Sequence, residues 1–447
     1  LCVSGAGTLL GDAGNVAEVA KEAAAEAAAP DFDSGHTAWM LVCCALVLLM
    51  TPGLALFYGG MVRTKNVLAT MMHSMICLGV ITVQWVVIGY TIAFGPTQGG
   101  WFGGLDHMFL AGIDQNTPYG DGEIPQYVFV AFQMMFAIIT PALISGAFAE
   151  RVKFWPFVIF TVLWATLVYD PLAHWVWGGG LLAEVEPAEG ETSISLIYRW
   201  FGTGAVDFAG GTVVHISSGF SALIAILILG RRKGYPQERI LPNNLVLSVI
   251  GAGMLWFGWF GFNGGSGLLS DGTAVNALLV THICAAVGAL SWSVAEVIHH
   301  GKVSMLGVIT GLVAGLVCIT PAAGTVDVSA ALIMGLLVGP VCYFAVAVLK
   351  SKLNYDDSLD AFGVHGVGGI LGAVLSGVFL SEGKIGFDLS GQLGAQIVSV
   401  IITMAYAGIV TAILVIVIDK TMGFRASEED EVTGLDVTEH GESGYNF

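Results

Sequence analysis

The polar residues of this chain are spaced so that long apolar runs lie between them. Eleven of these runs are long enough to cross the roughly 30 Å hydrocarbon core of a bilayer as helices. They cover residues 39–58, 67–94, 127–149, 154–177, 208–230, 244–263, 274–298, 305–321, 329–349, 359–380 and 395–418. The pattern predicts an all-α membrane protein with eleven transmembrane helices embedded in the lipid bilayer.

The basic residues between the runs predict how the helices are oriented. If all eleven runs cross, 13 of the 16 Lys and Arg residues fall on one side, and only Lys21, Arg199 and Lys384 fall on the other. Cytoplasmic loops carry an excess of these residues. We therefore expect a multi-pass protein of the cell (plasma) membrane, with its N-terminus outside and its C-terminus in the cytoplasm.

Composition agrees with a membrane protein and narrows its chemistry. The 447 residues are 55% hydrophobic and 11% charged. The net charge of -18 comes largely from the predicted outer loops and the tail, so it does not indicate a nucleic-acid partner. Carboxylates are nearly absent from the spans. Glu150 and Glu296 lie near span ends, and we expect Glu150, beside Arg151, to be a paired helix terminus. A metal-cation pathway, which needs rings of carboxylates or carbonyls, is therefore not indicated, and no CxxC motif indicates a metal site.

Three segments follow from these patterns. Residues 1–35 contain an Ala-rich stretch, which we interpret as an extracytoplasmic extension; the remnant of a processed signal segment is the alternative. Residues 36–424 form the membrane domain. Residues 425–447 form an acidic, polar tail, and this composition alone predicts disorder.

Short sequence echoes predict an internal repeat. "FYGG" ends the first run and "FNGG" ends the sixth, while "ITPA" occurs in the third and the eighth. Asp207 precedes His215 by eight residues in the fifth run, and Asp357 precedes His365 by eight in the tenth. Because five spans are an odd number, the second copy must be inverted. We expect an inverted five-helix repeat, spans 1–5 and 6–10, plus an eleventh helix.

The repeat pairs the two histidines. At a rise of 1.5 Å per residue, each histidine lies about 12 Å deeper in the membrane than its aspartate. Because the repeat is inverted, the two helices enter from opposite faces. The two imidazoles then lie within roughly 6 Å of each other in depth, near the midplane where repeat-built transporters place their sites. The plainer alternative is that each histidine bonds a neighbouring helix and each aspartate is a helix N-cap.

Aromatic residues gather at the predicted outer ends of several spans. Trp177, Phe136 and Phe262 stand there, with Ser266 four residues after Phe262. Aromatic faces and a hydroxyl suit a small cation, although tryptophan at a membrane interface is commonly part of the aromatic belt. From this chemistry alone the cargo is a small cation or a neutral polar solute.

Longer motifs carry a family resemblance. They are "LVLLMTPGLALFYGGMVRTKNVL", "GAFAERVKF", "AHWVWGGG", "DFAGGTVVHISSG", "WFGWFGFNGGSG", "FGVHGVGGI" and "GLDVTEHGESGY". Together they resemble the ammonium transporter family (Amt/MEP/Rh), on its bacterial or archaeal Amt branch. The resemblance extends from residue 35 to residue 447. It implies a homotrimer with one pore per subunit, no cofactor, and ammonium or ammonia as substrate, with methylammonium as an analogue.

The resemblance also implies roles for the residues at the predicted outer face. Trp177, Phe136, Ser266 and Asp207 match the site that recruits ammonium, where the carboxylate assists deprotonation. Phe136 and Phe262 match the pair of rings that gates the pore below that site.

Deeper in the membrane, the resemblance assigns the histidines. His215 and His365 match the twin histidines that line a narrow apolar conduit for ammonia. The proton released from ammonium is then expected to follow a separate polar or histidine-linked route.

The tail takes a different meaning from the resemblance. In the family it is ordered, packs beneath the neighbouring subunit and couples the pores, while cytoplasmic loops dock a PII-type signalling protein. The matching tail residues are Gly434, Asp436, Thr438, His440 and Gly441, and Thr438 is a candidate phosphorylation point.

Three alternatives stay open. An enzyme is disfavoured because the chain has no nucleotide-binding loop, no metal-spaced Cys/His cluster and no nucleophile constellation. An ammonium sensor with little flux usually carries a fused cytoplasmic domain, for which the 23 residues from Arg425 to Phe447 are too few. An Rh-like gas channel is disfavoured by the Amt-type aromatic and tail motifs.

Overall fold

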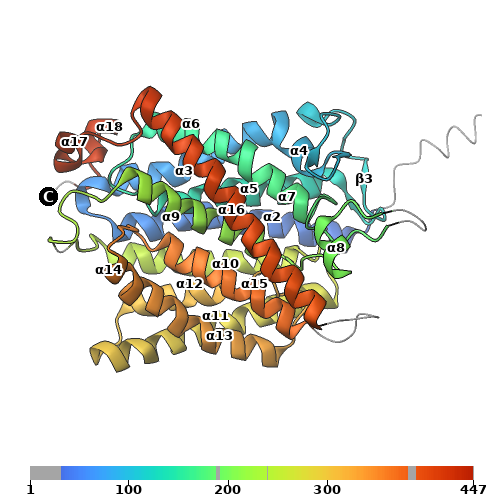
Figure 1. Cartoon of the computed structure of the whole chain (residues 1–447). Helices are drawn as coiled ribbons and strands as arrows, with labels where there is room; N and C mark the ends of the chain where they lie inside the picture. The colour runs from blue at the N-terminus through green and yellow to red at the C-terminus, as the bar shows by residue number, and fades with distance from the viewer. Residues whose placement is uncertain (1–31, 188–191, 239, 381–388, 446–447) are drawn as a thin grey trace, which may run out of the picture.

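The computed structural model describes residues 32–187, 192–238, 240–380 and 389–445 as a bundle of long helices (Figure 1). Most of the predicted extension at residues 1–35, and the basic residues Lys21, Arg239 and Lys384, lie outside the described residues.

Ten helical segments of the described chain are long and apolar enough to cross a membrane by length and composition. Five contain no π-helical turn: α2 (Ser34–Met61), α5 (Gln126–Ser145), α10 (Leu245–Gly265), α11 (Gly272–His300) and α16 (Leu389–Met422). The remaining expected run, 305–321, forms α12 (Met305–Ile319), which is apolar but shorter. The eleven-helix count therefore stays a prediction.

The other five long segments each contain a π-helical turn. They are α3 (Val67–Gln84), η2 (Trp85–Gly89) and α4 (Tyr90–Phe94); α6 (Phe154–Trp164), η4 (Ala165–Tyr169) and α7 (Asp170–Val176); η5 (Gly211–Ile216) and α9 (Ser217–Leu229); α13 (Val328–Tyr343), η6 (Phe344–Leu349) and α14 (Lys350–Leu353); and η7 (Phe362–Gly366) and α15 (Val367–Phe379). Single π-turns inside helices occur frequently at functional sites. Two of these turns, η5 and η7, contain the predicted pore histidines.

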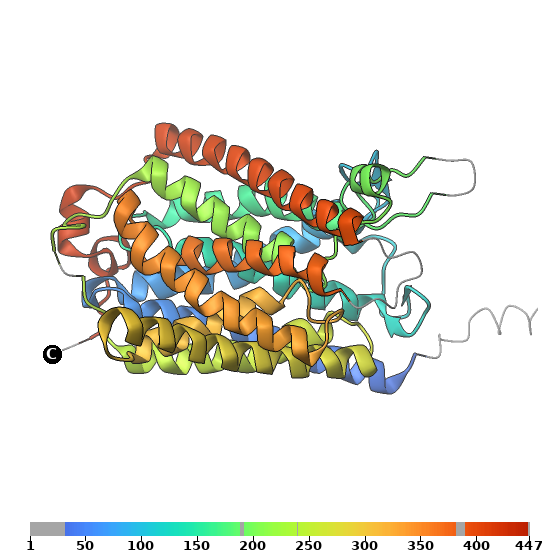
Figure 2. The same cartoon turned by 60° about the horizontal axis from the view of Figure 1, so that its bottom comes forward.

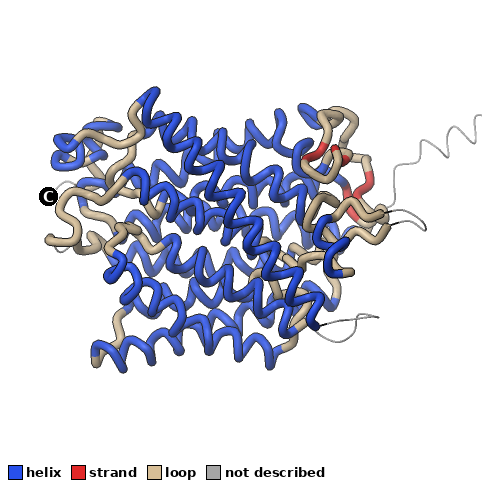
Figure 3. The backbone as a smooth tube through the Cα atoms, in the orientation of Figure 1, coloured by secondary structure: helices blue, strands red, loops and turns tan. Residues whose placement is uncertain are grey.

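Short elements connect the long helices. One end of the bundle holds the antiparallel pairs β1 (Thr97–Gln98) with β2 (Phe102–Gly103) and β3 (Pro118–Tyr119) with β4 (Ile124–Pro125) (Figure 3). These two-residue strands are small departures from the all-α prediction. The other connecting elements are η1 (Thr64–Asn66), η3 (Met108–Leu110) and α8 (Leu196–Phe201).

The two histidine-bearing segments run antiparallel. Arg232, just after α9, pairs with Asp356, just before η7, at 2.8 Å. The end of α9 therefore lies beside the start of η7. η5 also packs on α15, and η7 packs on α9. This reciprocal packing agrees with the predicted inverted repeat. α16 lies along the outside of the bundle (Figures 1 and 2).

The tail is folded, as the family resemblance implies and contrary to its composition. α17 (Glu428–Thr433) and α18 (Leu435–His440) lie at the end of the bundle opposite the strands (Figure 1). Leu435 and Asp436 are buried there. The tail therefore packs on the membrane domain of its own chain.

Candidate functional site

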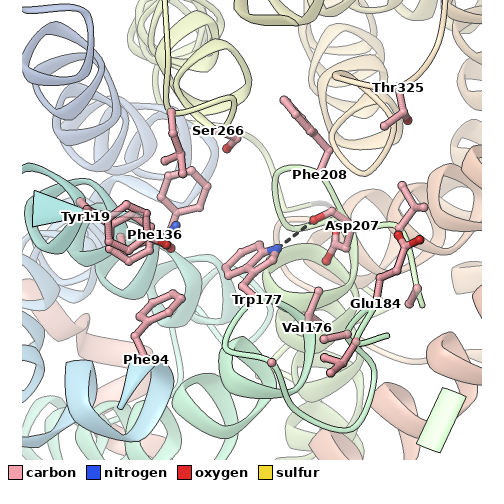
Figure 4. A pocket seen from close by; sticks show the side chains of 18 residues that line it. Phe94, Tyr119, Phe136, Val176, Trp177, Glu184, Asp207, Phe208, Ser266 and Thr325 are labelled. Carbon is pink, nitrogen blue, oxygen red and sulfur yellow. Dashed lines mark hydrogen bonds between the residues drawn. The ribbon is translucent and has the colours of Figure 1, made fainter. Parts of the chain in front are cut away.

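The four residues predicted to recruit ammonium line one pocket at the strand-bearing end of the bundle. This pocket has a volume of about 470 Å³. Phe136 comes from α5, Trp177 follows α7, Asp207 precedes η5 and Ser266 follows α10 (Figure 4). Residues from four separate spans thus converge on the same space.

Both aromatic and polar groups line this pocket. The Trp177 indole N–H donates to the Asp207 backbone oxygen at 2.8 Å (Figure 4). The rings of Phe136 and Trp177 meet edge to face, with centroids 6.2 Å apart. The Ser266 hydroxyl donates to the Phe262 carbonyl at 2.8 Å, which leaves its oxygen free to accept from a ligand. Such a set of groups suits a small cation that donates hydrogen bonds.

Asp207 is both a helix cap and a pocket residue. Its carboxylate accepts from the backbone N–H groups of Gly210, Thr212 and Val213 at 3.0, 2.9 and 3.0 Å. Asp207 therefore binds the first backbone N–H groups of η5, although the N-cap position itself is Gly210. Burial raises the pKa of this carboxyl and outweighs the backbone N–H groups, which lower it. Asp207 thus accepts a proton more readily than an ordinary aspartate.

Two phenyl rings close the bottom of the pocket. The centroids of Phe136 and Phe262 lie 4.1 Å apart with the planes inclined by 31°, and both side chains are 1% exposed. Phe262 also lines the next cavity, a space of about 10 Å³ that holds little more than one water-sized molecule. The predicted gate residues therefore separate an open pocket from a tight interior.

The two predicted pore histidines meet in that interior. The Nδ1 atoms of His215 and His365 lie 3.3 Å apart and the ring centroids 5.2 Å apart. The prediction that the two imidazoles lie close together is confirmed. Two bare imidazole nitrogens do not bond, so a hydrogen bond here requires one Nδ1–H to donate and the other Nδ1 to accept. Trp259 stacks on His215 at 5.4 Å, and the remaining lining is apolar.

The space continues toward the other end of the bundle. His365 also lines a second cavity of about 10 Å³, together with Tyr58 and Asp360. Asp360 in turn lines a wider pocket of about 270 Å³, where Lys350 pairs with it at 2.5 Å. Shared lining residues thus connect the histidine-lined cavity to the opposite end, whereas the rings of Phe136 and Phe262 lie between that cavity and the outer pocket. The sequence candidates did not include Asp360, although a charge at the start of the run 359–380 was a signal.

Several buried charges at this opposite end are paired. Glu150 contacts Arg63 at 3.0 Å and Arg232 at 2.8 Å. Arg151 contacts Asp356 at 2.8 Å. Glu150 is therefore part of a paired terminus, as expected, and its partners come from other loops instead of from its neighbour Arg151.

The predicted tail residues dock onto the start of α3. The Asp436 carboxylate accepts from the backbone N–H groups of Leu68 and Ala69 at 3.1 and 2.8 Å. Gly434 has a φ of 114°, and a Cβ there would lie 2.6 Å from the Lys65 Cβ, so only glycine fits. The contact therefore depends on two residues of the tail motif.

The last turn of the tail is more open. His440 packs edge to face on Phe154 with centroids 5.1 Å apart, and Gly441 ends α18 with a φ of 67°. Thr438 is exposed, and its hydroxyl donates to the Gly434 carbonyl at 3.2 Å. A modifying enzyme would therefore find Thr438 on the surface of this chain.

Comparison with known proteins decides the family. The model of the Ammonium Transporter Family matches residues 38–445. The chain belongs to the ammonium transporter family. Its relatives are transporters and not enzymes. It is 45% identical to an ammonium transporter of Bacillus subtilis over 418 residues, which cover 92% of this chain and 98% of that one.

Solved structures of this family share the fold. Saccharomyces cerevisiae Mep2 matches with a TM-score of 0.79 and 32% identity, covering 89% of this chain and 88% of that chain. A structure titled as a sensor Amt protein matches with a TM-score of 0.82 and 28% identity, covering 91% of this chain and 98% of that one. The ammonium transporter fold therefore extends over nearly the whole described chain.

Proposed function

We propose that this protein carries ammonium across the membrane as ammonia. Ammonium binds among Trp177, Phe136 and Ser266, and Asp207 assists the loss of its proton. Ammonia then passes the rings of Phe136 and Phe262 and moves along the histidine-lined interior, while the proton crosses separately. The observation that supports this most strongly is the pair of buried histidines in mutual contact directly below the phenyl pair.

The energetics favour this order of steps. Moving a bare cation into an apolar interior costs tens of kcal/mol by simple solvation estimates. A cavity of about 10 Å³ leaves no room for a hydration shell. Potassium cannot shed a proton, so a route that requires deprotonation rejects it. Neutral ammonia suits the apolar lining.

The surrounding assembly is part of the same proposal. In this proposal the chain crosses the membrane eleven times, with α12 as the eighth span. The tail then lies in the cytoplasm, and the pocket of Figure 4 faces the outside. Three copies form the transporter, each with its own pore. The tail couples neighbouring pores, and a PII-type protein binds the cytoplasmic face.

Replacing both histidines tests the transport route. We expect His215→Ala combined with His365→Ala to abolish ammonium-selective currents or to open them to potassium. The measurement is electrophysiology on reconstituted protein with ammonium, methylammonium and potassium. His282→Ala is the matched control, because His282 lies in α11 and is exposed on the bundle surface. Unchanged ammonium-selective currents in the double variant would sink the proposal.

A sensor with little flux is the second candidate, favoured by the similarity to the structure titled as a sensor Amt protein. The same recordings separate the two functions. A transporter gives sustained ammonium currents, whereas a sensor binds ammonium and gives none.

A further inference from the structure

Asp170 is a carboxyl group buried inside the fourth span. It begins α7 and is 0% exposed. Asp170 precedes Trp177 by seven positions, so it lies about 10 Å below the recruitment pocket at the rise of an α-helix. Ionisable residues inside spans are costly and generally serve a function. The expectation that the spans are nearly free of carboxylates missed this residue.

The partners of Asp170 leave several polar atoms unused. The Gln84 amide donates to Asp170 Oδ2 at 2.6 Å and to the Thr166 hydroxyl at 3.1 Å. Asp170 Oδ1, Gln84 Oε1 and the Tyr169 hydroxyl are buried and have no hydrogen-bond partner among the described residues. Buried polar groups generally bond to protein or to ordered water. A cluster with three such atoms fits a water molecule or a mobile proton.

The backbone around this cluster departs from α-helical geometry on both sides. The π-turn η2 begins directly after Gln84, and the π-turn η4 ends at Tyr169, directly before Asp170. The two π-turns contact each other. The same departure holds His215 and His365 in η5 and η7. Like the pore histidines, the cluster therefore lies at π-helical turns.

We propose that Gln84, Tyr169 and Asp170 form a second buried proton-exchange site beside the conduction route. The inference rests on the proposed function and assigns a temporary holder for the proton that ammonium releases. The Tyr169 hydroxyl lies within electrostatic range of both Asp170 and Asp207, so it is the group proposed to relay the proton from one carboxyl group to the other. Gln84 positions Asp170, and a water molecule bridges the unpartnered oxygens.

The exchange step transfers a single proton. The Tyr169 hydroxyl passes its proton to the bridging water, and the water passes a proton to Asp170 Oδ1. At the same time the Tyr169 hydroxyl receives a proton from the Asp207 carboxyl group. Only O–H bonds form and break, and one positive charge moves toward Asp170. Asp170 then releases this proton into the separate proton route and can accept the next one. In the structural alternative, Asp170 and Gln84 only hold two helices together.

Tyr169→Phe and Asp170→Asn distinguish the two roles. The Tyr169 hydroxyl bonds to nothing among the described residues, so a structural role predicts that its removal leaves transport unchanged. Asn keeps the size and hydrogen bonding of Asp170 but cannot hold the proton. We expect the ammonium-driven charge movement to fall about 100-fold in both variants. This factor is the lower end of what a positioned proton-transfer group contributes.

The measurement is charge translocation by the full chain in proteoliposomes, with Asp271→Asn as control. Asp271 is an exposed N-cap of α11, and Asn serves equally well in that position. Wild-type currents in Tyr169→Phe overturn the proposal, even if Asp170→Asn fails to reach the membrane. A wild-type chain that moves no ammonium contradicts the proposed function instead.

Infrared difference spectroscopy gives a readout that does not depend on transport. We expect added ammonium to change a carbonyl band of a protonated carboxylic acid in the wild type and in Asp271→Asn. Asp170→Asn should lack this component. A band that persists unchanged in Asp170→Asn also overturns the assignment.

Discussion

Among the single residues, Asp207 explains how one side chain serves both fold and site. Three backbone N–H groups at the start of η5 hold its carboxylate in place. Its backbone oxygen fixes the Trp177 ring at the same time. In the proposed function, a cation in the pocket binds best to the charged form of Asp207, whereas burial favours the neutral form. We therefore expect the raised pKa of Asp207 to set the pH at which recruitment weakens.

We expect methylammonium uptake to fall as the outside pH drops through this raised pKa. Above it the carboxylate is charged and attracts the cation, and below it the carboxyl is neutral. Methylammonium itself stays charged throughout. Initial uptake rates measured against outside pH should show this acidic limb in the wild type and in Asp271→Asn. An identical limb in Asp207→Asn would contradict the assignment.

The candidate residues that sequence reasoning found differ in kind from those it missed. Trp177, Ser266 and His365 stand in long family motifs, so their place followed from the motif. Asp170 and Asp360 stand outside the residues that the motifs assign. Their role depends on which way a buried side chain points, and residue spacing does not specify that direction.

At the level of helices, the apolar runs gave most boundaries to within a few residues, because burial in lipid requires an apolar surface along the whole span. The π-turns were not predictable. A single π-turn such as η4 widens the helix locally but leaves an apolar run equally apolar. The run 154–177 therefore predicted one plain helix where the structure has α6, η4 and α7.

The charges that join α9 to η7 make the next prediction. Burial alone would raise the pKa of Asp356, but hydrogen bonds from Arg232 and the charge of Arg151 outweigh it and lower the pKa to about 2. This carboxylate therefore stabilises the fold above the ordinary aspartate pKa, and the contribution is lost as pH falls through about 2. At neutral pH, Asp356→Ala removes a partner of two buried guanidinium groups.

We expect Asp356→Ala to lower the free energy of unfolding by about 3 kcal/mol, typical of breaking a buried ion pair. Thermal unfolding of the detergent-solubilised protein measures the change. Asp327→Ala removes an exposed N-cap of α13 and should cost only about 1 kcal/mol. Equal losses in the two variants would show that the buried pairing is not needed for stability.

For the molecule as a whole, the tail and the bundle form one folded unit within each chain. The matched glycines Gly434 and Gly441 test this. Ala at Gly434 meets Lys65 at 2.6 Å, whereas a Cβ at Gly441 meets nothing within 4 Å. We expect Gly434→Ala to detach the tail and to speed tryptic cleavage after Arg425. Gly441→Ala should add only local backbone strain of about 1 kcal/mol. Equal cleavage rates would contradict this account of docking.

Whether the short helix α12 crosses the membrane determines the number of spans and whether the two termini lie on opposite sides. Its 15 residues span roughly 22 Å at an α-helical rise, less than the hydrocarbon core. Most of α12 is buried among other helices, so the non-helical residues after it can lie within the membrane without facing lipid. We therefore expect α12 to cross with the turn that follows it, which places Lys302 and Ser329 on opposite faces.

Single cysteines at exposed positions in loops and at a helix start test this arrangement. The six described cysteines are buried or partly buried. In the test variants, Cys2 is first mutated to Ser. A membrane-impermeant thiol reagent should label Gln115→Cys and Ser329→Cys in intact cells, but Lys302→Cys only after permeabilisation. Those three positions are all exposed. Labelling of Lys302→Cys and Ser329→Cys from the same face would leave ten crossings, because α12 would then not span the membrane, and the two termini would lie on the same side.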